Sequence, residues 1–184
     1  MLSKIALGVL AVLAILGLVI ATRPAHFRIE RSALVHAPRE HVFPLIDDFQ
    51  QWPKWSPWEK LDPTMKKTFS GAPKGNGAEY AWAGNAKAGE GRMTILDSQP
   101  SELVSVKLEF LKPFAATNLA AFKLVPAGAG SQVTWSMEGN NGFIAKAFCM
   151  VMDMDALVGK DFEEGLANLD RLAQSAPPAT PASP

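Results

Sequence analysis

The chain has 184 residues, which is enough for one domain with a substantial hydrophobic core and too few for two once a segment at each end is set aside. Lysine plus arginine and aspartate plus glutamate both number 18, so the net charge disfavours nucleic acid as a partner. The only cysteine, Cys149, excludes an intramolecular disulfide and a zinc site built from several cysteines.

The first predicted element is an uncharged apolar run at residues 5–21, flanked by Lys4 and Arg23. Its length is near the lower limit for a helix that crosses the hydrocarbon core of a membrane. Such a run is either an uncleaved anchor or a signal peptide, for which Val19 and Ala21 provide a tolerable cleavage pattern. Because the run exceeds the usual signal-peptide core, we expect a transmembrane anchor within residues 1–25 and a single-pass membrane protein.

The basic residues around this run bear on the orientation. Arg23 favours a cytoplasmic domain, whereas Lys4 and the free amino terminus favour the opposite. Arg28 and Arg31 are expected in a folded strand and therefore count less. The balance favours a domain outside the cytoplasm.

A single domain is expected at residues 26–174. The first strand is predicted from the alternation of apolar residues between Phe27 and Val35, although Arg31 interrupts the apolar face. Pro38 then fits the first turn of a helix, and Pro44 should kink or shorten that helix.

Six further strand-like runs follow a tryptophan-rich segment and are separated by turn residues. Short consecutive strands with tight turns predict an antiparallel sheet, and the last run alternates most cleanly between apolar and polar residues. The six runs are residues 65–70, 78–82, 92–97, 102–110, 118–125 and 132–138.

One long helix is predicted over residues 144–173. Its apolar residues fall on one stripe, which should pack on the apolar face of the sheet. The stripe consists of Ile144, Phe148, Val151, Val158, Phe162, Leu166 and Leu169. Residues 175–184 are rich in proline and alanine and predict a disordered tail.

This order of elements resembles the helix-grip fold of the START-like or SRPBCC superfamily, and it is most similar to the polyketide cyclase/dehydrase and lipid-transport branch. The resemblance rests on Ala37-Pro38 through Val42-Phe43 to Ile46-Asp47, on residues 52–58, and on residues 154–169. It covers residues 26–174 and neither the anchor nor the tail.

The resemblance implies an α+β domain with a helix-grip architecture. An antiparallel sheet of about six or seven strands would wrap around the long C-terminal helix, with two short helices after the first strand. A hollow between sheet and helix would hold a hydrophobic or lipid-like small molecule. The resemblance implies no catalytic residues, because this superfamily contains carriers, sensors and enzymes.

Aromatic and sulfur-containing side chains are the candidates to line this hollow, since such residues provide large apolar contact areas. Ordinary core packing is the alternative for each of them. The candidates are Trp52, Trp55, Trp58, Tyr80, Trp82, Met93, Phe110, Phe114, Trp135 and Met137, together with Met154, Val158 and Phe162 from the terminal helix.

Asp155 is a further candidate because it falls within the apolar stripe of the predicted helix. Such a carboxylate is either an acid/base or ligand-orienting group with a pKa raised by desolvation, or a helix cap that bonds the backbone. The acidic residues between Asp153 and Glu164 mimic part of a calcium loop, but Leu157 and Val158 occupy positions that such a loop does not tolerate. We therefore expect no metal and no cofactor.

Two functional hypotheses follow. The first is a membrane-tethered module that binds a hydrophobic small molecule or lipid without changing it. The second is an enzyme of the cyclase, dehydratase or hydrolase type, in which Asp155, together with Tyr80 or a histidine, moves protons. The sequence indicates neither the identity of the ligand nor the oligomeric state.

Overall fold

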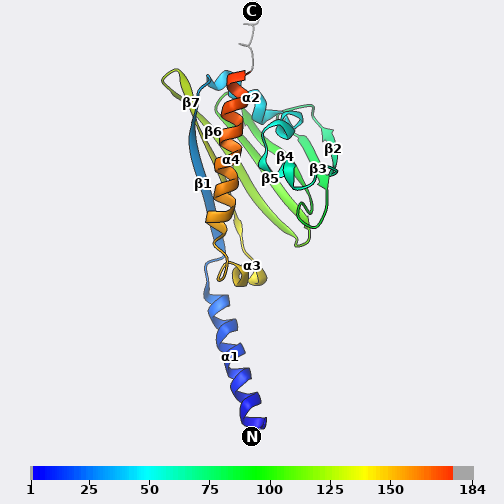
Figure 1. The fold of residues 1–184 in the computed structure, drawn as a ribbon, viewed down its shortest axis with the longest axis vertical. Helices are drawn as coiled ribbons and strands as arrows, with labels where there is room; N and C mark the ends of the chain where they lie inside the picture. The colour runs from blue at the N-terminus through cyan, green and yellow to red at the C-terminus, as the bar shows by residue number, and fades with distance from the viewer. Residues whose placement is uncertain (1, 176–184) are drawn as a thin grey trace, which may run out of the picture.

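The N-terminal helix projects away from the rest of the molecule in the computed structural model, which describes residues 2–175 (Figure 1). This helix, α1 (Leu2–Thr22), is the one helix among the described residues with the length and apolar composition of a membrane span, and a signal sequence has the same properties. Most of its apolar side chains lie exposed rather than in a protein core, although Ile20 is buried. Of the predicted tail, Ser175 ends the last helix and residues 176–184 lie outside the described part of the chain.

Seven antiparallel strands form one sheet in the order β1-β7-β6-β5-β4-β3-β2. Each strand predicted from the alternation of residues is present close to its expected position. Because β1 pairs with β7, the first and last strands of the domain lie side by side. The strands are β1 (His26–Val35), β2 (Lys66–Gly71), β3 (Ala78–Ala83), β4 (Glu90–Gln99), β5 (Leu103–Lys112), β6 (Ala116–Ala127) and β7 (Gly130–Asn140).

Three short helices connect β1 to β2. They are the α-helix α2 (Arg39–Asp47) and the 3-10 helices η1 (Phe49–Lys54) and η2 (Pro57–Leu61). Pro44 lies inside α2, and the prolines at positions 53 and 57 lie within η1 and at the start of η2. Proline lacks the amide hydrogen that a continuing α-helix needs, which explains why α2 and η1 are short, whereas Pro57 stands at the first position of η2, where proline is tolerated.

The predicted helix over residues 144–173 is wrong in one respect, because the structure contains two helices there. They are α3 (Phe143–Phe148) and α4 (Met154–Ser175). The side chain of Asp153 accepts a hydrogen bond of 3.0 Å from the amide of Ala156, so it caps and starts α4. As a result, the first part of the predicted stripe does not continue into α4 and stays exposed.

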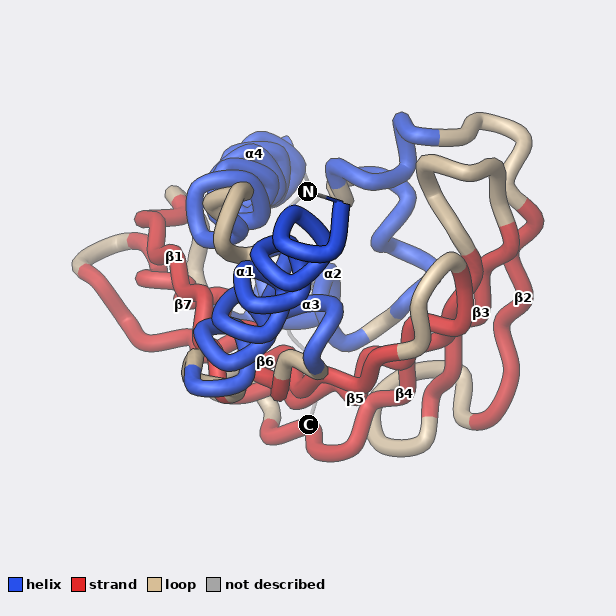
Figure 2. Tube along the Cα trace, turned by 90° about the horizontal axis from the view of Figure 1, so that it is seen from below, coloured by secondary structure: helices blue, strands red, loops and turns tan. Residues whose placement is uncertain are grey.

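The sheet curves around α4, which lies mainly over β1 and also contacts β7 (Figures 1 and 2). From α4, Phe162, Leu166 and Leu169 are buried against the sheet, next to Val133 and Trp135 of β7. Burial of each such side chain contributes about 1.5–3 kcal/mol to stability. The architecture is therefore the helix-grip arrangement that the sequence resemblance implies.

Candidate functional site

One face of the sheet carries most of the side chains that were predicted to bind a ligand. Residues paired directly across antiparallel strands share a face. Tyr80 pairs with Met93, Met93 with Leu108, and Trp82 with Gly91. We call this the inner face, because α4 packs over it. Its predicted ligand-binding residues are Tyr80, Trp82, Met93, Phe110, Trp135 and Met137.

Aromatic rings fill the half of the inner face that lies far from α1. Trp135 and Phe162 stack with ring centroids 4.2 Å apart and an interplanar angle of 5°. Trp52 and Trp55 are almost fully buried, and both donate their indole N–H to main-chain carbonyl oxygens of α2. The expectation of a hollow between sheet and terminal helix is therefore wrong at this level, where the rings are in contact. We call this part the closed half.

Burial decreases along the inner face toward the end of the sheet that adjoins α1. On β5, Val106 is fully buried whereas Leu108 and Phe110 are partly exposed. On α4, Phe162 is buried whereas Met154 is exposed. The turn between β5 and β6 and the start of β1 lie at this same end (Figure 1). The inner face becomes accessible here, and we call this part the open half. Its partly exposed residues are Trp82, Leu108, Phe110 and Val158, and it also includes the buried side chains of Met93 and Met137.

A polar cluster lies beside the inner face. The Tyr80 hydroxyl donates to Glu59 Oε1 at 3.1 Å, and Lys67 forms an ion pair with the same carboxylate. The Glu59 side chain is only 13% exposed. Burial of the phenol, followed by the nearby negative charge of Glu59, raises the pKa of Tyr80 well above its ordinary 10.0. Tyr80 is therefore protonated at neutral pH and is a hydrogen-bond donor.

Trp58 and Phe114 differ from the other candidates in their surroundings. Trp58 is partly buried, and its indole N–H donates to Asp161 Oδ2 of α4 at 3.1 Å. Phe114 lies in the turn between β5 and β6, is 61% exposed, and contacts Phe148 of α3 with ring centroids 6.3 Å apart. Phe114 is therefore not on the inner face with the rest of the set.

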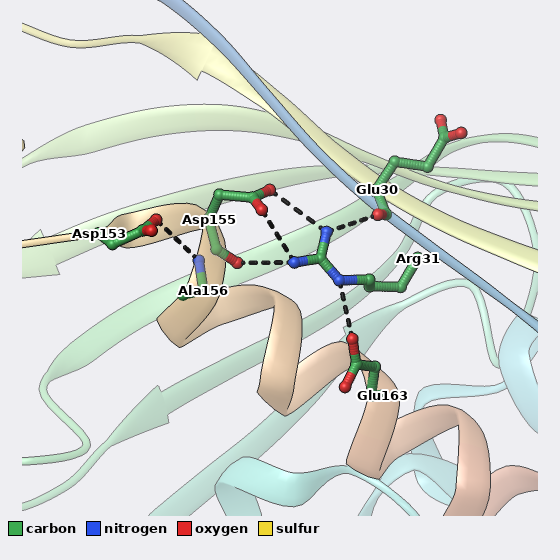
Figure 3. Close-up of polar contacts among 6 residues, drawn as sticks. All are labelled: Glu30, Arg31, Asp153, Asp155, Ala156 and Glu163. Carbon is green, nitrogen blue, oxygen red and sulfur yellow. Dashed lines mark hydrogen bonds and ion pairs between the residues drawn. The ribbon is translucent and has the colours of Figure 1, made fainter.

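Arg31 links β1 to the start of α4 (Figure 3). Its Nη2 donates to Asp155 Oδ2 at 2.9 Å and to the Asp155 carbonyl at 3.0 Å, while Nε donates to Glu163 Oε1 at 3.0 Å. Arg31 pairs with Trp135 across the strands and so faces α4. A methyl group added at Gly159 would lie 2.0 Å from Nη2, so the guanidinium packs directly on this glycine.

These contacts correct the expectation that desolvation raises the pKa of Asp155. Its side chain is 59% exposed, and the hydrogen bond from Arg31 lowers its pKa. A position in the apolar stripe requires an unbroken helix, whereas the chain turns between α3 and α4. The cap of α4 is Asp153 rather than Asp155. Asp155 thus holds α4 to β1 through Arg31.

Surface pockets lie at the edge of the inner face and beside the end of α4. A pocket of about 120 Å³ lies between η1 and the hairpin of β2 and β3. A larger pocket of about 430 Å³ lies between the 3-10 helices and the end of α4, and its lining includes Lys60 and Arg171. Its volume falls in the range of small-molecule sites, but its lining is mixed and highly charged, whereas such sites are predominantly apolar. Among residues 2–175 no group of three or more His, Cys, Asp or Glu residues is placed to hold a metal ion.

The sequence interpretation missed three residues of the inner face. Phe27 and Asn118 both lie over Gly139, and Asn118 also donates to the sulfur of Met137 at 3.7 Å. Leu108 lies beside Met93. The period-two alternation of β5 and β6 contains the signal for Leu108 and Asn118, whereas the candidates predicted on the strands are all aromatic residues or methionines.

Solved structures with the same fold confirm the architecture. CV1439 from Chromobacterium violaceum is 17% identical with a TM-score of 0.56, and the match covers 84% of this chain and 100% of that protein. MLL2253 from Mesorhizobium loti is 14% identical with a TM-score of 0.60, and the match covers 82% and 100% of the two chains. Ara h 8.0201 is 14% identical with a TM-score of 0.57, covering 82% and 99%. At these identities the likeness establishes the fold alone.

The family comparison agrees with the sequence resemblance and covers the same residues. No protein with a curated description matches the chain. The model of the family described as polyketide cyclase / dehydrase and lipid transport matches residues 26–174, which are the whole domain from the start of β1 almost to the end of α4. The chain therefore belongs to the polyketide cyclase / dehydrase and lipid transport family, within the SRPBCC superfamily.

Proposed function

We propose that the protein is a membrane-anchored domain that binds a hydrophobic or lipid-like small molecule on the open half of the inner face. The observation that carries the proposal is the gradient of burial along β5 and α4, which leaves an apolar surface accessible at one end of an otherwise closed core. Apolar walls with a few placed polar groups are typical of small-molecule sites. The family description, which includes lipid transport, supports the same class of ligand.

Within this proposal the two halves have different roles. Trp52, Trp55, Trp135 and Phe162 of the closed half form a rigid floor, because their rings pack against one another. The open half supplies the apolar walls. Asn118 supplies an amide and Tyr80 a hydroxyl near these walls, so they are the groups that would orient a polar end of the ligand.

The proposed anchor is the apolar run at residues 5–21, within α1. As expected from the sequence, the proposal takes this segment as uncleaved and the domain as lying outside the cytoplasm. The tether would keep the domain at a membrane, where hydrophobic ligands are concentrated.

The test is extraction of the purified, detergent-solubilised protein with organic solvent, followed by mass spectrometry. The test variant is Leu108→Trp, which adds bulk to the open half, and the matched control is Leu119→Trp, because Leu119 pairs with Lys107 and Glu138 on the outer face. The wild type and the control should carry the same co-purifying molecule. The test variant should bind it roughly tenfold more weakly, which corresponds to about 1.4 kcal/mol. Absence of any such molecule, or equal retention by both variants, contradicts the proposal.

A second candidate function is an enzyme of the cyclase, dehydratase or hydrolase type. The observation that favours it is the hydrogen bond between Tyr80 and the largely buried Glu59, which places a phenol and a carboxylate beside the inner face. Turnover of the extracted molecule by wild type but not by Glu59→Gln would support this candidate. Recovery of the molecule unchanged after prolonged incubation would exclude turnover of that molecule.

A further inference from the structure

Exposed apolar side chains are concentrated in α3 and the turn that follows it. Not one residue of α3 is buried. Val151 in the turn is 82% exposed, and the aromatic ring of Phe114 extends the surface from the neighbouring turn of the sheet. We call this surface the apolar end patch; it consists of Phe114, Phe143, Ile144, Phe148, Val151 and Met152.

The apolar end patch adjoins the end of α1. Lys146 Nζ of α3 donates to the carbonyl oxygen of Ala21 at 3.3 Å, and α3 packs against α1. Figures 1 and 2 show α3 beside the last turns of α1, at the end of the domain from which α1 projects. A membrane surface that meets the C-terminal end of α1 therefore also meets α3.

The composition of this segment matches that location. Residues 143–152 contain a single charged residue, Lys146, and no acidic residue. Apolar side chains beside a lysine enter the boundary between lipid headgroups and acyl chains, because the lysine extends its ammonium group toward the headgroups. A face left open to water would instead keep this apolar surface exposed at a cost in free energy.

We propose that the apolar end patch is immersed in the headgroup region of the same phospholipid bilayer that α1 crosses. The open half of the inner face would then meet the bilayer surface, so a hydrophobic ligand would enter the site from the lipid phase without crossing water. This inference rests on the anchoring role of α1 in the proposed function.

The test uses the full chain in vesicles of phosphatidylcholine and phosphatidylglycerol. Cys149 is the only cysteine, is exposed, and directly follows α3 as its C-cap, so an environment-sensitive fluorophore can be attached to it without mutation. Lipids brominated near the top or near the middle of the acyl chain report depth by quenching. The matched control carries the same fluorophore on Ala129→Cys in a Cys149→Ser background, because Ala129 is exposed at the β6–β7 turn at the opposite end of the sheet.

We expect the fluorophore at position 149 to lose roughly half of its intensity or more with the shallow bromines and less with the deep ones, as an interfacial depth requires. The control at position 129 should lose nothing. If neither fluorophore is quenched while the protein still floats with the vesicles, the inference is overturned but the anchoring role of α1 is not. A protein that does not float overturns both the anchor and the inference. If the signal at position 149 instead depends on the protein-to-lipid ratio, a second copy of the protein covers the apolar end patch, and the inference is overturned.

A substitution within the apolar end patch provides an independent measurement. Val151→Asp adds a charge at a position that is exposed in the folded protein, so folding should be unaffected. It should reduce the quenching at position 149 by roughly half, because a charged residue leaves the interface. The matched control is Val125→Asp, an exposed position of β6, which should leave the quenching unchanged. Unchanged quenching in both variants overturns the inference.

Discussion

Arg31 is a charged residue on the apolar face of a strand, and its contacts explain how the fold accommodates it. The guanidinium extends over Gly159 to the surface and is 24% exposed, so its charge remains partly hydrated. Asp155 and Glu163 lie on either side of it and neutralise that charge. Because both acceptors belong to α4, the arginine determines where this helix starts relative to β1.

The pH dependence of stability should reflect the pair of Asp155 and Arg31. The pKa of Asp155 in the folded chain lies below the ordinary 3.8, so its contribution to stability is present above about pH 4 and is lost as the pH falls through the lowered value. Asp155→Asn should therefore be less stable than wild type at pH 7, and the difference should shrink toward zero in strong acid. Chemical unfolding of both proteins at several pH values measures it.

The matched control for this prediction is Asp97→Asn on β4, whose carboxylate accepts from the Gln99 amide rather than from an arginine. It should show a smaller difference from wild type at pH 7. A wild-type advantage over Asp155→Asn that persists unchanged at the lowest pH would show that the side-chain charge does not contribute.

Tyr80 provides a second test at this scale, because it is the only tyrosine and its ionisation is visible in the ultraviolet spectrum. Its pKa is raised, so the associated stability is present below pH 10 and is lost as the pH rises further. Little tyrosinate should form at pH 10 in the folded chain. Glu59→Gln should move the midpoint down but not to the ordinary value, since burial remains.

Glu79→Gln is the control for that titration, since it removes a neighbouring carboxylate that bonds Ser70 instead of Tyr80. Its midpoint should stay close to that of the wild type. Half-ionisation of the wild-type phenol near pH 10, with the fold intact, would contradict the proposed environment.

At the scale of the elements, the approach of α4 to the sheet depends on Gly165. A methyl group added there would lie 2.6 Å from the ring of Trp135, which is buried and stacked on Phe162 and so has no room to move. Gly165→Ala should therefore destabilise the domain by about 1–3 kcal/mol through overpacking. This should occur although alanine favours a helix over glycine by about 1 kcal/mol.

Gly159→Ala is the matched control in the same helix. The atoms nearest to its added methyl group all belong to the flexible guanidinium of Arg31, which can move away. The gain in helix propensity should offset much of the lost ion pairing, so this variant should be the more stable of the two. Thermal or denaturant unfolding of both variants measures the difference, and equal stability would contradict the role assigned to Trp135.

The elements differ in how well the sequence predicted them. The strands were predicted because each alternates polar and apolar residues and is bounded by turn residues, which are local properties. The break between α3 and α4 was missed because apolar residues from Ile144 to Val151 continue the helical spacing of α4 by coincidence. The cap at Asp153 was the available signal for that break.

The candidate site was only partly predictable. The sequence identified aromatic residues that share the inner face, because strand alternation determines the face of each side chain. It could not separate the closed half from the open half, since the burial of Trp135 depends on its stacking against Phe162 of α4, which lies far from it in the sequence. The contact between Arg31 and Asp155 joins residues far apart in the sequence and follows only from the packing of α4 on β1.

At the scale of the whole molecule, removal of residues 1–25 should separate the anchor from the domain. The truncated chain retains every strand and α4, so it should fold and no longer resist extraction from membranes by alkaline carbonate. A fragment that still resists extraction would contradict the anchoring role of α1. A reporter enzyme fused after Gln174 of the full chain tests the side of the membrane, since activity specific to the outside requires translocation of the domain.

The connection between α1 and β1 limits how far such an anchored domain can travel. Only Arg23, Pro24 and Ala25 separate the two elements, and three extended residues span about 10 Å. A linker this short holds the domain against its own bilayer and does not allow the domain to reach a second bilayer. If the protein transfers a lipid-like ligand, the acceptor must come to it, as a soluble carrier or as a neighbour in the same membrane.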